Sequence, residues 1–244
     1  MATDEFGFPL GEGWPEIDAK GMTEVDLLMV HSYGITLPQM MENAGLSLAT
    51  LARARYFGGN AEGRRVVVLA GAGGNGGGAL TAARRLAAWG AKVVLVLAQD
   101  AAAMTPVPTL QLGILREMGL HPADVPADAP DLILDGLVGY SLRGDPHGRA
   151  AELIGWANAS PAPVLALDAP SGFDAASGAL RAPAMQADAT LTLALPKAGL
   201  AGCAATGALY LADISVPPGL YARLSVPRAV PTFAKGTILR LSKP

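Results

Sequence analysis

The sequence predicts an α/β protein: a three-layer fold with a mostly parallel sheet flanked by helices. Short apolar strands alternate with helical segments along the chain, which is typical of parallel strands joined by right-handed crossovers. The β-branched run at 66–70 leads into six glycines within eight positions, and a helix-forming segment follows. Of the 244 residues, 51% are hydrophobic and 16% are charged, a balance that suits strands buried on both faces.

Length and charge narrow the class of protein further. A chain of this length fits one large domain or two small ones. The net charge of −3 argues against a nucleic-acid partner held through its phosphates. The single cysteine excludes an internal disulfide, and three scattered histidines give no zinc pattern. With no secretory signal and no membrane-length apolar stretch in view, we expect a cytoplasmic protein without a membrane partner.

Two helices are predicted before the first strand. Residues 1–21 mix glycine, proline and acidic residues without a period, so we expect an irregular N-terminal arm. Apolar residues at helical spacing predict a short amphipathic helix over 23–32. Thr36 is typical of a helix N-cap and Pro38 of a first helical turn, which predicts a second helix running to about Phe57.

The rest of the chain alternates between strands and helices. The predicted strands are 66–70, 92–97, 131–135, 164–168, 189–194 and 209–214, with a weak edge strand at 237–241. The predicted helices are 79–89, 108–119 and 148–157. Ligands of such folds bind beyond the carboxyl ends of the strands. Three loops at that edge are therefore candidate ligand contacts, namely 71–78, 135–145 and 168–172.

The glycine run at 71–78 carries the most specific functional signal. Gly71, Gly73 and Gly76 satisfy G-x-G-x-x-G between a strand and a helix. Only glycine lets the backbone approach a ligand this closely and take positive φ without a clash, and the free N–H groups of the following helix can face an anion. The run favours a nucleotide or phosphate ligand. A tight turn without any ligand is the alternative.

Polar residues at the strand ends could supply the chemistry. Asp168 ends a strand, and a carboxylate at the mouth of a nucleotide site suits a general acid or base. Asp135, Asn75 and Ser171 are hard oxygen donors on neighbouring loops, which suits a monovalent cation. Turn capping is the alternative for both carboxylates. Lys197 follows a strand at the same edge, where a salt-bridged or solvated lysine is expected.

Four segments in order resemble the NAD(P)H-hydrate epimerases, the YjeF N-terminal domain family. These segments are 40–45, 71–78, Asp135 with 139–145, and 168–174, and the resemblance runs from about Met22 to Tyr221. It implies a Rossmann-like single domain over 22–244 and a homodimer. It also implies an isomerase that interconverts the R and S epimers of NADH or NADPH hydrated at C6 of the nicotinamide ring.

The resemblance implies roles for individual residues as well. Asp168 resembles the acidic residue at the reacting ring, and Asn75, Asp135 and Ser171 resemble the ligands of a potassium ion. The substrate-binding residues that it implies are Gly74, Asn75, Gly76, Gly77, Gly78, Gly139, Tyr140, Ser141, Leu142, Arg143, Gly144, Asp145 and Asp168. In this loop Arg143 could pair with a phosphate, or it could be a solvated surface arginine.

Two other functions fit parts of the sequence. Gly74 and Gly78 stand where the family turn carries Asn and Asp, which favours a non-catalytic nucleotide- or protein-binding module on the same scaffold. If the chain is an epimerase, Gly78→Asp is expected to improve substrate binding. The literal glycine pattern and Asp100 suggest an NAD-dependent dehydrogenase, although two helices precede the first strand. Turnover of hydrated NADH separates an epimerase from a binding module.

Overall fold

A computed structural model describes residues 2–224 and 230–242 of the chain. Its main sheet contains β1 (Leu10–Gly11), β2 (Arg65–Ala70), β3 (Lys92–Leu97), β4 (Leu132–Gly136), β5 (Val164–Leu167), β8 (Ala189–Leu193), β9 (Ala208–Ala212) and β10 (Ile238–Leu241). Their order is β1-β10-β9-β8-β5-β4-β2-β3, and every neighbouring pair is parallel except β10 with β9. The predicted end of the domain at residue 244 lies outside the described residues.

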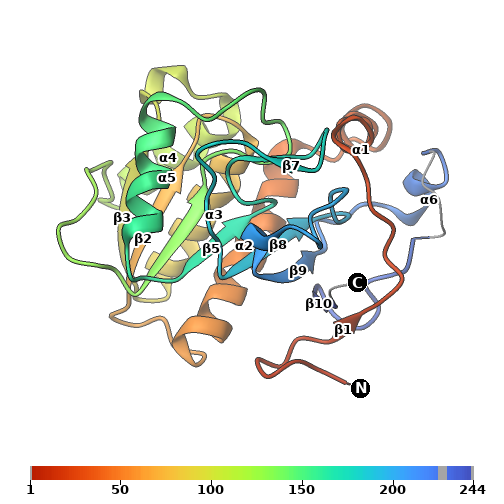
Figure 1. Cartoon of the computed structure of the whole chain (residues 1–244), viewed down its shortest axis with the longest axis horizontal. Helices are drawn as coiled ribbons and strands as arrows, with labels where there is room; N and C mark the ends of the chain where they lie inside the picture. Colours follow the sequence, from red (N-terminus) through yellow and green to blue (C-terminus); the bar gives the residue numbers. More distant parts are fainter. Residues whose placement is uncertain (1, 225–229, 243–244) are drawn as a thin grey trace.

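Helices lie on both faces of this sheet, so the predicted three-layer α/β fold is confirmed (Figure 1). They are α1 (Ala19–Tyr33), α2 (Leu37–Phe57), α3 (Gly74–Ala88), α4 (Pro106–Glu117), α5 (Gly148–Ala159) and the short α6 (Pro218–Tyr221). Single helical turns at Ala101–Ala103 and Ala204–Thr206 and a small hairpin of β6 (Phe173–Asp174) with β7 (Ala179–Leu180) complete the elements. None of the described helices has the length and apolarity that crossing a membrane requires.

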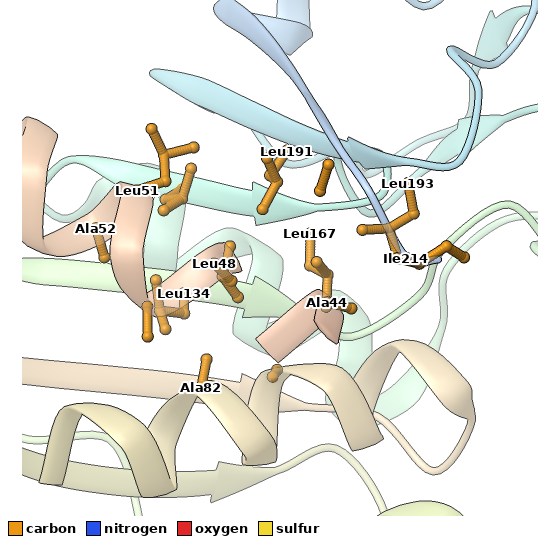
Figure 2. Close-up of a cluster of buried hydrophobic side chains, with 14 of the residues drawn as sticks. Ala44, Leu48, Leu51, Ala52, Ala82, Leu134, Leu167, Leu191, Leu193 and Ile214 are labelled. Carbon is orange, nitrogen blue, oxygen red and sulfur yellow. The ribbon is translucent and has the colours of Figure 1, made fainter. Parts of the chain in front are cut away.

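The strand β2 shows how sequence alternation builds the two outer layers. Val66, Val68 and Ala70 pack into the cluster formed with α1–α4, whereas Val67 and Leu69 pack into the cluster formed with α5. Successive side chains of a strand point to opposite faces, so one continuous apolar run buries both faces. Figure 2 shows the α2 side of this core, with the α2 residues Ala44, Leu48, Leu51 and Ala52 facing the strand residues Leu134, Leu167 and Leu191.

The N-terminal arm is more ordered than its composition predicts. The strand β1 pairs with β10, and the Ile17 N–H donates to the Pro196 carbonyl over 2.9 Å. The helix α1 begins four residues before the predicted start, because Asp18 accepts the Gly21 N–H over 2.7 Å as an N-cap. A two-residue strand carries no periodicity of its own, so only its pairing with a distant strand defines it.

The helix that follows β2 begins earlier than predicted, inside the glycine run. The helix α3 begins at Gly74, five residues before the predicted start, so most of the run lies in its first two turns. None of the glycines at 71–78 adopts a positive φ, and close backbone approach explains Gly71 and Gly76 instead. A Cβ on Gly76 would lie 1.9 Å from the Gly71 carbonyl oxygen, and a Cβ on Gly71 would lie 1.9 Å from that of Leu137. A side chain at Gly71 or Gly76 would clash with the backbone.

The topology places a crevice at the carboxyl edge of the sheet. The chain passes from β2 to β3 on one side and then returns to β4 on the other side of β2. Ligand sites of α/β proteins form where the strand order reverses in this way, outside the carboxyl ends of the strands. The residues after β2 and after β4 are therefore the ones that this fold presents to a ligand.

Candidate functional site

A cleft of about 360 Å³ opens at this edge of the sheet. Three of the predicted loops meet in it: Gly74 and Asn75 begin α3, Gly139, Tyr140 and Ser141 follow β4, and Asp168 follows β5. The remaining lining comes mainly from apolar side chains and from both N-terminal helices, namely Met22, Asp26, Leu37, Met41, Thr105, Pro106, Val107, Leu193, Lys197 and Ile214. The cleft can therefore hold a flat, largely apolar group beside a few polar ones.

Asp168 is held rigidly at the wall of this cleft. The strand β5 ends at Leu167, and Asp168 takes a left-handed φ of 67°, which aspartate tolerates better than most residues. The whole residue is only 3% exposed. Oδ2 accepts the Tyr140 N–H over 3.1 Å, and Oδ1 is paired with the Lys197 ammonium. A buried carboxylate with fixed partners suits proton transfer at a defined point.

Lys197 is the cationic partner that the site requires. The residue is fully buried, and its Nζ also donates to the Leu193 carbonyl over 2.9 Å. The same Nζ lies 5.9 Å from the centroid of the Tyr140 ring. The sequence predicted a salt-bridged or solvated lysine, and the structure shows the salt bridge. Breaking such a buried pair would leave an uncompensated charge, so Lys197 fixes the position of Asp168.

Asp135 and Ser171 form a second buried polar centre, beneath the cleft. The Ser171 hydroxyl donates to Asp135 Oδ1 over 2.6 Å, and its N–H donates to Oδ2 over 2.8 Å. The Val138 N–H donates to the same hydroxyl over 3.0 Å. Burial raises the pKa of Asp135, and the hydrogen bonds from Ser171 oppose that rise. These contacts join the loops that follow β4 and β5.

Asn75 lies beside the loop after β4, at Gly139. A Cβ on Gly139 would lie 3.2 Å from the Asn75 Oδ1 and 3.0 Å from Asp168 Oδ2, so the glycine lets both side chains approach the loop after β4. The Asn75 Nδ2 is buried and makes no hydrogen bond within the described residues. A buried amide of this kind has unused capacity to bind something else.

Other predicted substrate residues lie away from the cleft. Gly76, Gly77 and Gly78 do not line it and are packed inside α3, where a Cβ on Gly77 would lie 2.8 Å from Val107 Cγ1 and one on Gly78 would lie 2.7 Å from Leu167 Cδ2. The four remaining loop residues are also outside the lining: Leu142, Arg143, Gly144 and Asp145. Arg143 is exposed.

The pair of Asp26 and Tyr140 was not anticipated from the sequence. The Tyr140 hydroxyl donates to Asp26 Oδ2 over 2.6 Å, joining α1 to the loop after β4. Burial raises the pKa of both groups. Met22 and Asp26 are four residues apart and both line the cleft. That spacing places two residues on one helical face, and it is the signal in the sequence that could have suggested the contact.

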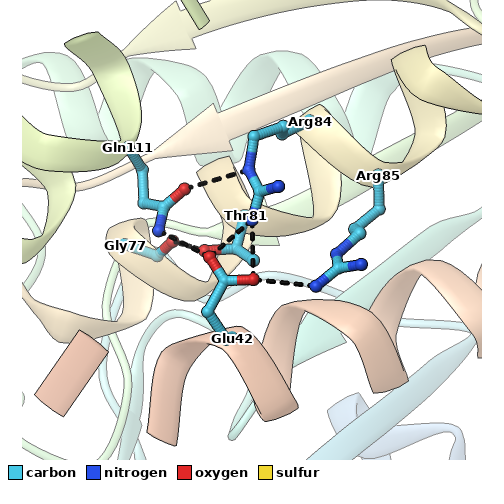
Figure 3. Close-up of polar contacts among 6 residues, drawn as sticks. All are labelled: Glu42, Gly77, Thr81, Arg84, Arg85 and Gln111. Atoms are coloured by element: carbon cyan, nitrogen blue, oxygen red, sulfur yellow. Dashed lines mark hydrogen bonds and ion pairs between the residues drawn. The ribbon is translucent and has the colours of Figure 1, made fainter. Parts of the chain in front are cut away.

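A polar cluster around Glu42 braces the C-terminal half of α3 (Figure 3). The Glu42 carboxylate accepts Arg84 over 2.6 Å, Arg85 over 2.9 Å and Gln111 over 3.0 Å, so it connects α2, α3 and α4. Burial acts to raise the pKa of Glu42, but the hydrogen bonds from Arg84, Gln111 and Arg85 outweigh it, and the pKa is lowered. This cluster holds the helix whose first turn forms one wall of the cleft.

Comparisons with known proteins agree with this architecture. Residues 37–199 match the family described as YjeF-related protein N-terminus. The chain is 42% identical over 235 residues to the NAD(P)H-hydrate epimerase of Dehalogenimonas lykanthroporepellens, covering 95% of each chain. It is 38% identical over 191 residues to the NAD(P)H-hydrate epimerase of Truepera radiovictrix, covering 78% of this chain and 84% of that one.

A longer relative and a solved structure extend the comparison. The chain is 33% identical over 232 residues to the bifunctional NAD(P)H-hydrate repair enzyme Nnr of Moorella thermoacetica, covering 89% of this chain and 44% of that protein. The fold is similar to the crystal structure of yeast ynu0, YNL200c, with a TM-score of 0.75 at 23% identity, covering 93% of this chain and 99% of that one. The chain therefore belongs to the YjeF-related N-terminal domain family.

Proposed function

We propose that the chain is an NAD(P)H-hydrate epimerase, an isomerase that interconverts the R and S epimers of NADH or NADPH hydrated at C6 of the nicotinamide ring. The observation that carries this proposal is Asp168, a buried carboxylate fixed by Lys197 and Tyr140 at the wall of a mainly apolar cleft. The relatives that match the chain over most of their own length bear the same name.

The reaction needs proton transfer at oxygen and no redox partner. The C6–O bond breaks, the lone pair of the ring nitrogen forms a C=N bond, and the leaving oxygen takes up a proton. Water then adds to C6 from the other face, the π electrons return to nitrogen, and the water gives up a proton. Asp168 exchanges a proton with one of these two oxygens, and such general acid–base catalysis contributes about 10²–10⁴-fold.

The rest of the cleft supports binding of a dinucleotide. The N–H groups in the first turn of α3 point out of the helix at Gly74 and Asn75, where they can meet a phosphate. Apolar side chains such as Met41, Val107 and Ile214 line the cleft beside Asp168, and they suit the flat nicotinamide ring. Substrate binding through these residues is part of the proposal.

We also propose that Asn75, Asp135 and Ser171 hold a potassium ion. Their donor set fits, because a fully buried carboxylate without a cationic side chain in contact among the described residues can neutralise such an ion. Turning the Asn75 amide by half a rotation would present oxygen where the unpaired Nδ2 now lies. The ion would fix the loops after β2, β4 and β5 around the cleft. Anomalous density at these residues in crystals grown with rubidium tests it.

The epimerase proposal is tested by following separated R and S hydrates with native protein and with Asp168→Asn. The variant should keep its circular dichroism spectrum and lose about 10²–10⁴-fold in rate. Asp128→Asn removes a carboxylate from an exposed position and should leave the rate unchanged. Native protein that binds NADH but equilibrates the hydrates no faster than buffer would instead be the non-catalytic binding module.

A homodimer is a further part of the proposal. The helix α4 exposes Leu110, Ile114 and Met118, which are 49%, 37% and 43% accessible and four residues apart, and a second copy of the chain could cover this apolar stripe. Light scattering gives the oligomeric state, and a monomer at micromolar concentration would contradict the proposal. The cytoplasmic location expected from the sequence stays a prediction.

A further inference from the structure

Two carboxylates face the same cleft from different elements. Asp168 follows β5, and Asp26 belongs to α1. Tyr140 lies between them, because its N–H donates to Asp168 Oδ2 over 3.1 Å and its hydroxyl donates to Asp26 Oδ2 over 2.6 Å. Backbone nitrogen and phenol oxygen are the two ends of a tyrosine, so this residue bridges the two carboxylates, and all three residues line the cleft.

We propose that Asp26 is a second acid–base residue of this cleft, positioned by Tyr140, and that it serves the face of the substrate ring opposite to the one served by Asp168. This inference rests on the proposed epimerase function. An epimerisation through loss and addition of water exchanges oxygen on both faces of one carbon. A carboxylate fixed by an ion pair reaches only one face. Inverting glycosidases, which also exchange oxygen on opposite faces of one carbon, use two separated carboxyl groups.

The surroundings of the two carboxyl groups differ in the way that this division of labour requires. Asp168 is paired with the Lys197 ammonium. The charged and titratable groups that face Asp26 are Tyr140, Lys197 and Asp168. Burial raises the pKa of Asp26, the Tyr140 hydrogen bond and Lys197 oppose that rise, and Asp168 adds to it. Asp168 therefore contacts a cation and Asp26 a phenol, and two carboxyl groups in such different surroundings can divide the roles of base and acid.

The protons balance over one turnover. Asp26 gives its proton to the hydroxyl that leaves C6, while the C6–O bond breaks and the nitrogen lone pair forms the C=N bond. Water then attacks the other face of C6, the π electrons return to nitrogen, and Asp168 takes the proton that the water loses. Asp168 then releases this proton to solvent and Asp26 regains one from solvent, which returns both groups to their starting state. The reverse epimerisation uses the same two groups in exchanged roles. Of the two Asp26 carboxylate oxygens, only Oδ2 has a hydrogen-bond partner among the described residues. Oδ1 is therefore available to the substrate.

The test compares kcat against pH for native protein, Asp26→Asn and Tyr140→Phe with separated hydrates. Asp26 must be protonated to act as the acid, so the native rate falls as pH rises through its pKa. Asp26→Asn should lose about 10²-fold or more in kcat with little change in KM, and it should lose this alkaline fall. Tyr140→Phe removes a hydrogen bond that lowers the pKa of Asp26, so the fall should move to higher pH.

Glu24→Gln is the matched control, because Glu24 lies on the exposed side of the same helix; its rate and pH profile should equal those of native protein. Two results would overturn this inference and leave the proposed function standing. In the first, Asp26→Asn keeps the alkaline fall in rate. In the second, Asp26→Asn loses less than about threefold in kcat while Asp168→Asn is inactive. If Asp26→Asn does not fold, an unmoved alkaline fall in Tyr140→Phe overturns it. A native chain without epimerase activity overturns the proposed function and this inference together.

Discussion

Replacing Gly78 by aspartate should destabilise the fold rather than strengthen substrate binding. The family turn carries aspartate at this position, and from the sequence the substitution was expected to improve binding. The structure argues against that expectation, because Gly78 is buried inside α3 and does not line the cleft. A Cβ there would lie 2.7 Å from Leu167 Cδ2, 3.5 Å from Met41 Sδ and 3.8 Å from Ala44 Cβ.

The expected loss follows from these contacts. Forcing extra atoms into a packed core costs about 1–3 kcal/mol, and burying a polar group without a partner costs roughly another 1–3 kcal/mol. The higher helix propensity of aspartate returns less than about 0.5 kcal/mol. The net loss is about 3 kcal/mol, which for a chain of this length lowers Tm by roughly 6–12 °C. Apolar surroundings raise the pKa of the new carboxyl group, so the loss should grow as pH rises through that pKa.

Thermal unfolding of Gly78→Asp, Gly78→Ala and Gly113→Asp separates these contributions. Gly78→Ala carries the steric cost without the charge. Gly113 lies on the exposed side of α4, and a Cβ there meets nothing within 4 Å, so Gly113→Asp should change Tm little. A Gly78→Asp variant that unfolds at or above the native Tm, or that binds NADH more tightly, would refute the reasoning from packing.

Three further measurements test other contacts. Potassium should raise Tm more than sodium does, and Asp135→Asn should abolish this difference, since a cation would neutralise that buried carboxylate; an equal response of both proteins would contradict the ion site. Hydrogen bonds from Arg84 and other donors lower the pKa of Glu42, so they stabilise the fold only while the carboxylate is ionised. In urea, Glu42→Gln should therefore cost more stability near neutral pH than at about pH 3, below the usual pKa of glutamate, and equal losses would contradict this. Tyr210→Phe removes the hydroxyl that donates to Asp4 over 2.8 Å; hydrogen exchange in the first residues should quicken, with a loss of about 1 kcal/mol, and unchanged exchange would show that the arm is held elsewhere.

Local pattern was sufficient for the architecture. The helix N-cap at Thr36 and the proline after it placed α2 to the residue at both ends, because capping and φ restriction act within one turn. The strand at 92–97 was predicted with its observed bounds, since a run of valine and leucine is typical of a strand. The alternation of strands and helices then required that the loops after β2, β4 and β5 meet at one edge.

The amino-acid sequence by itself thus determined the fold class, the edge where the cleft forms and the loops that line it, because each depends on periodicity and chain order. Tertiary structure alone decided which side chains meet there. Lys197 reaches Asp168 across 29 positions and Tyr140 reaches Asp26 across 114, and β1 exists only through its pairing with β10. Contacts between residues so far apart leave no trace in local spacing, since they depend on how the layers pack and on where each buried polar group finds its partner.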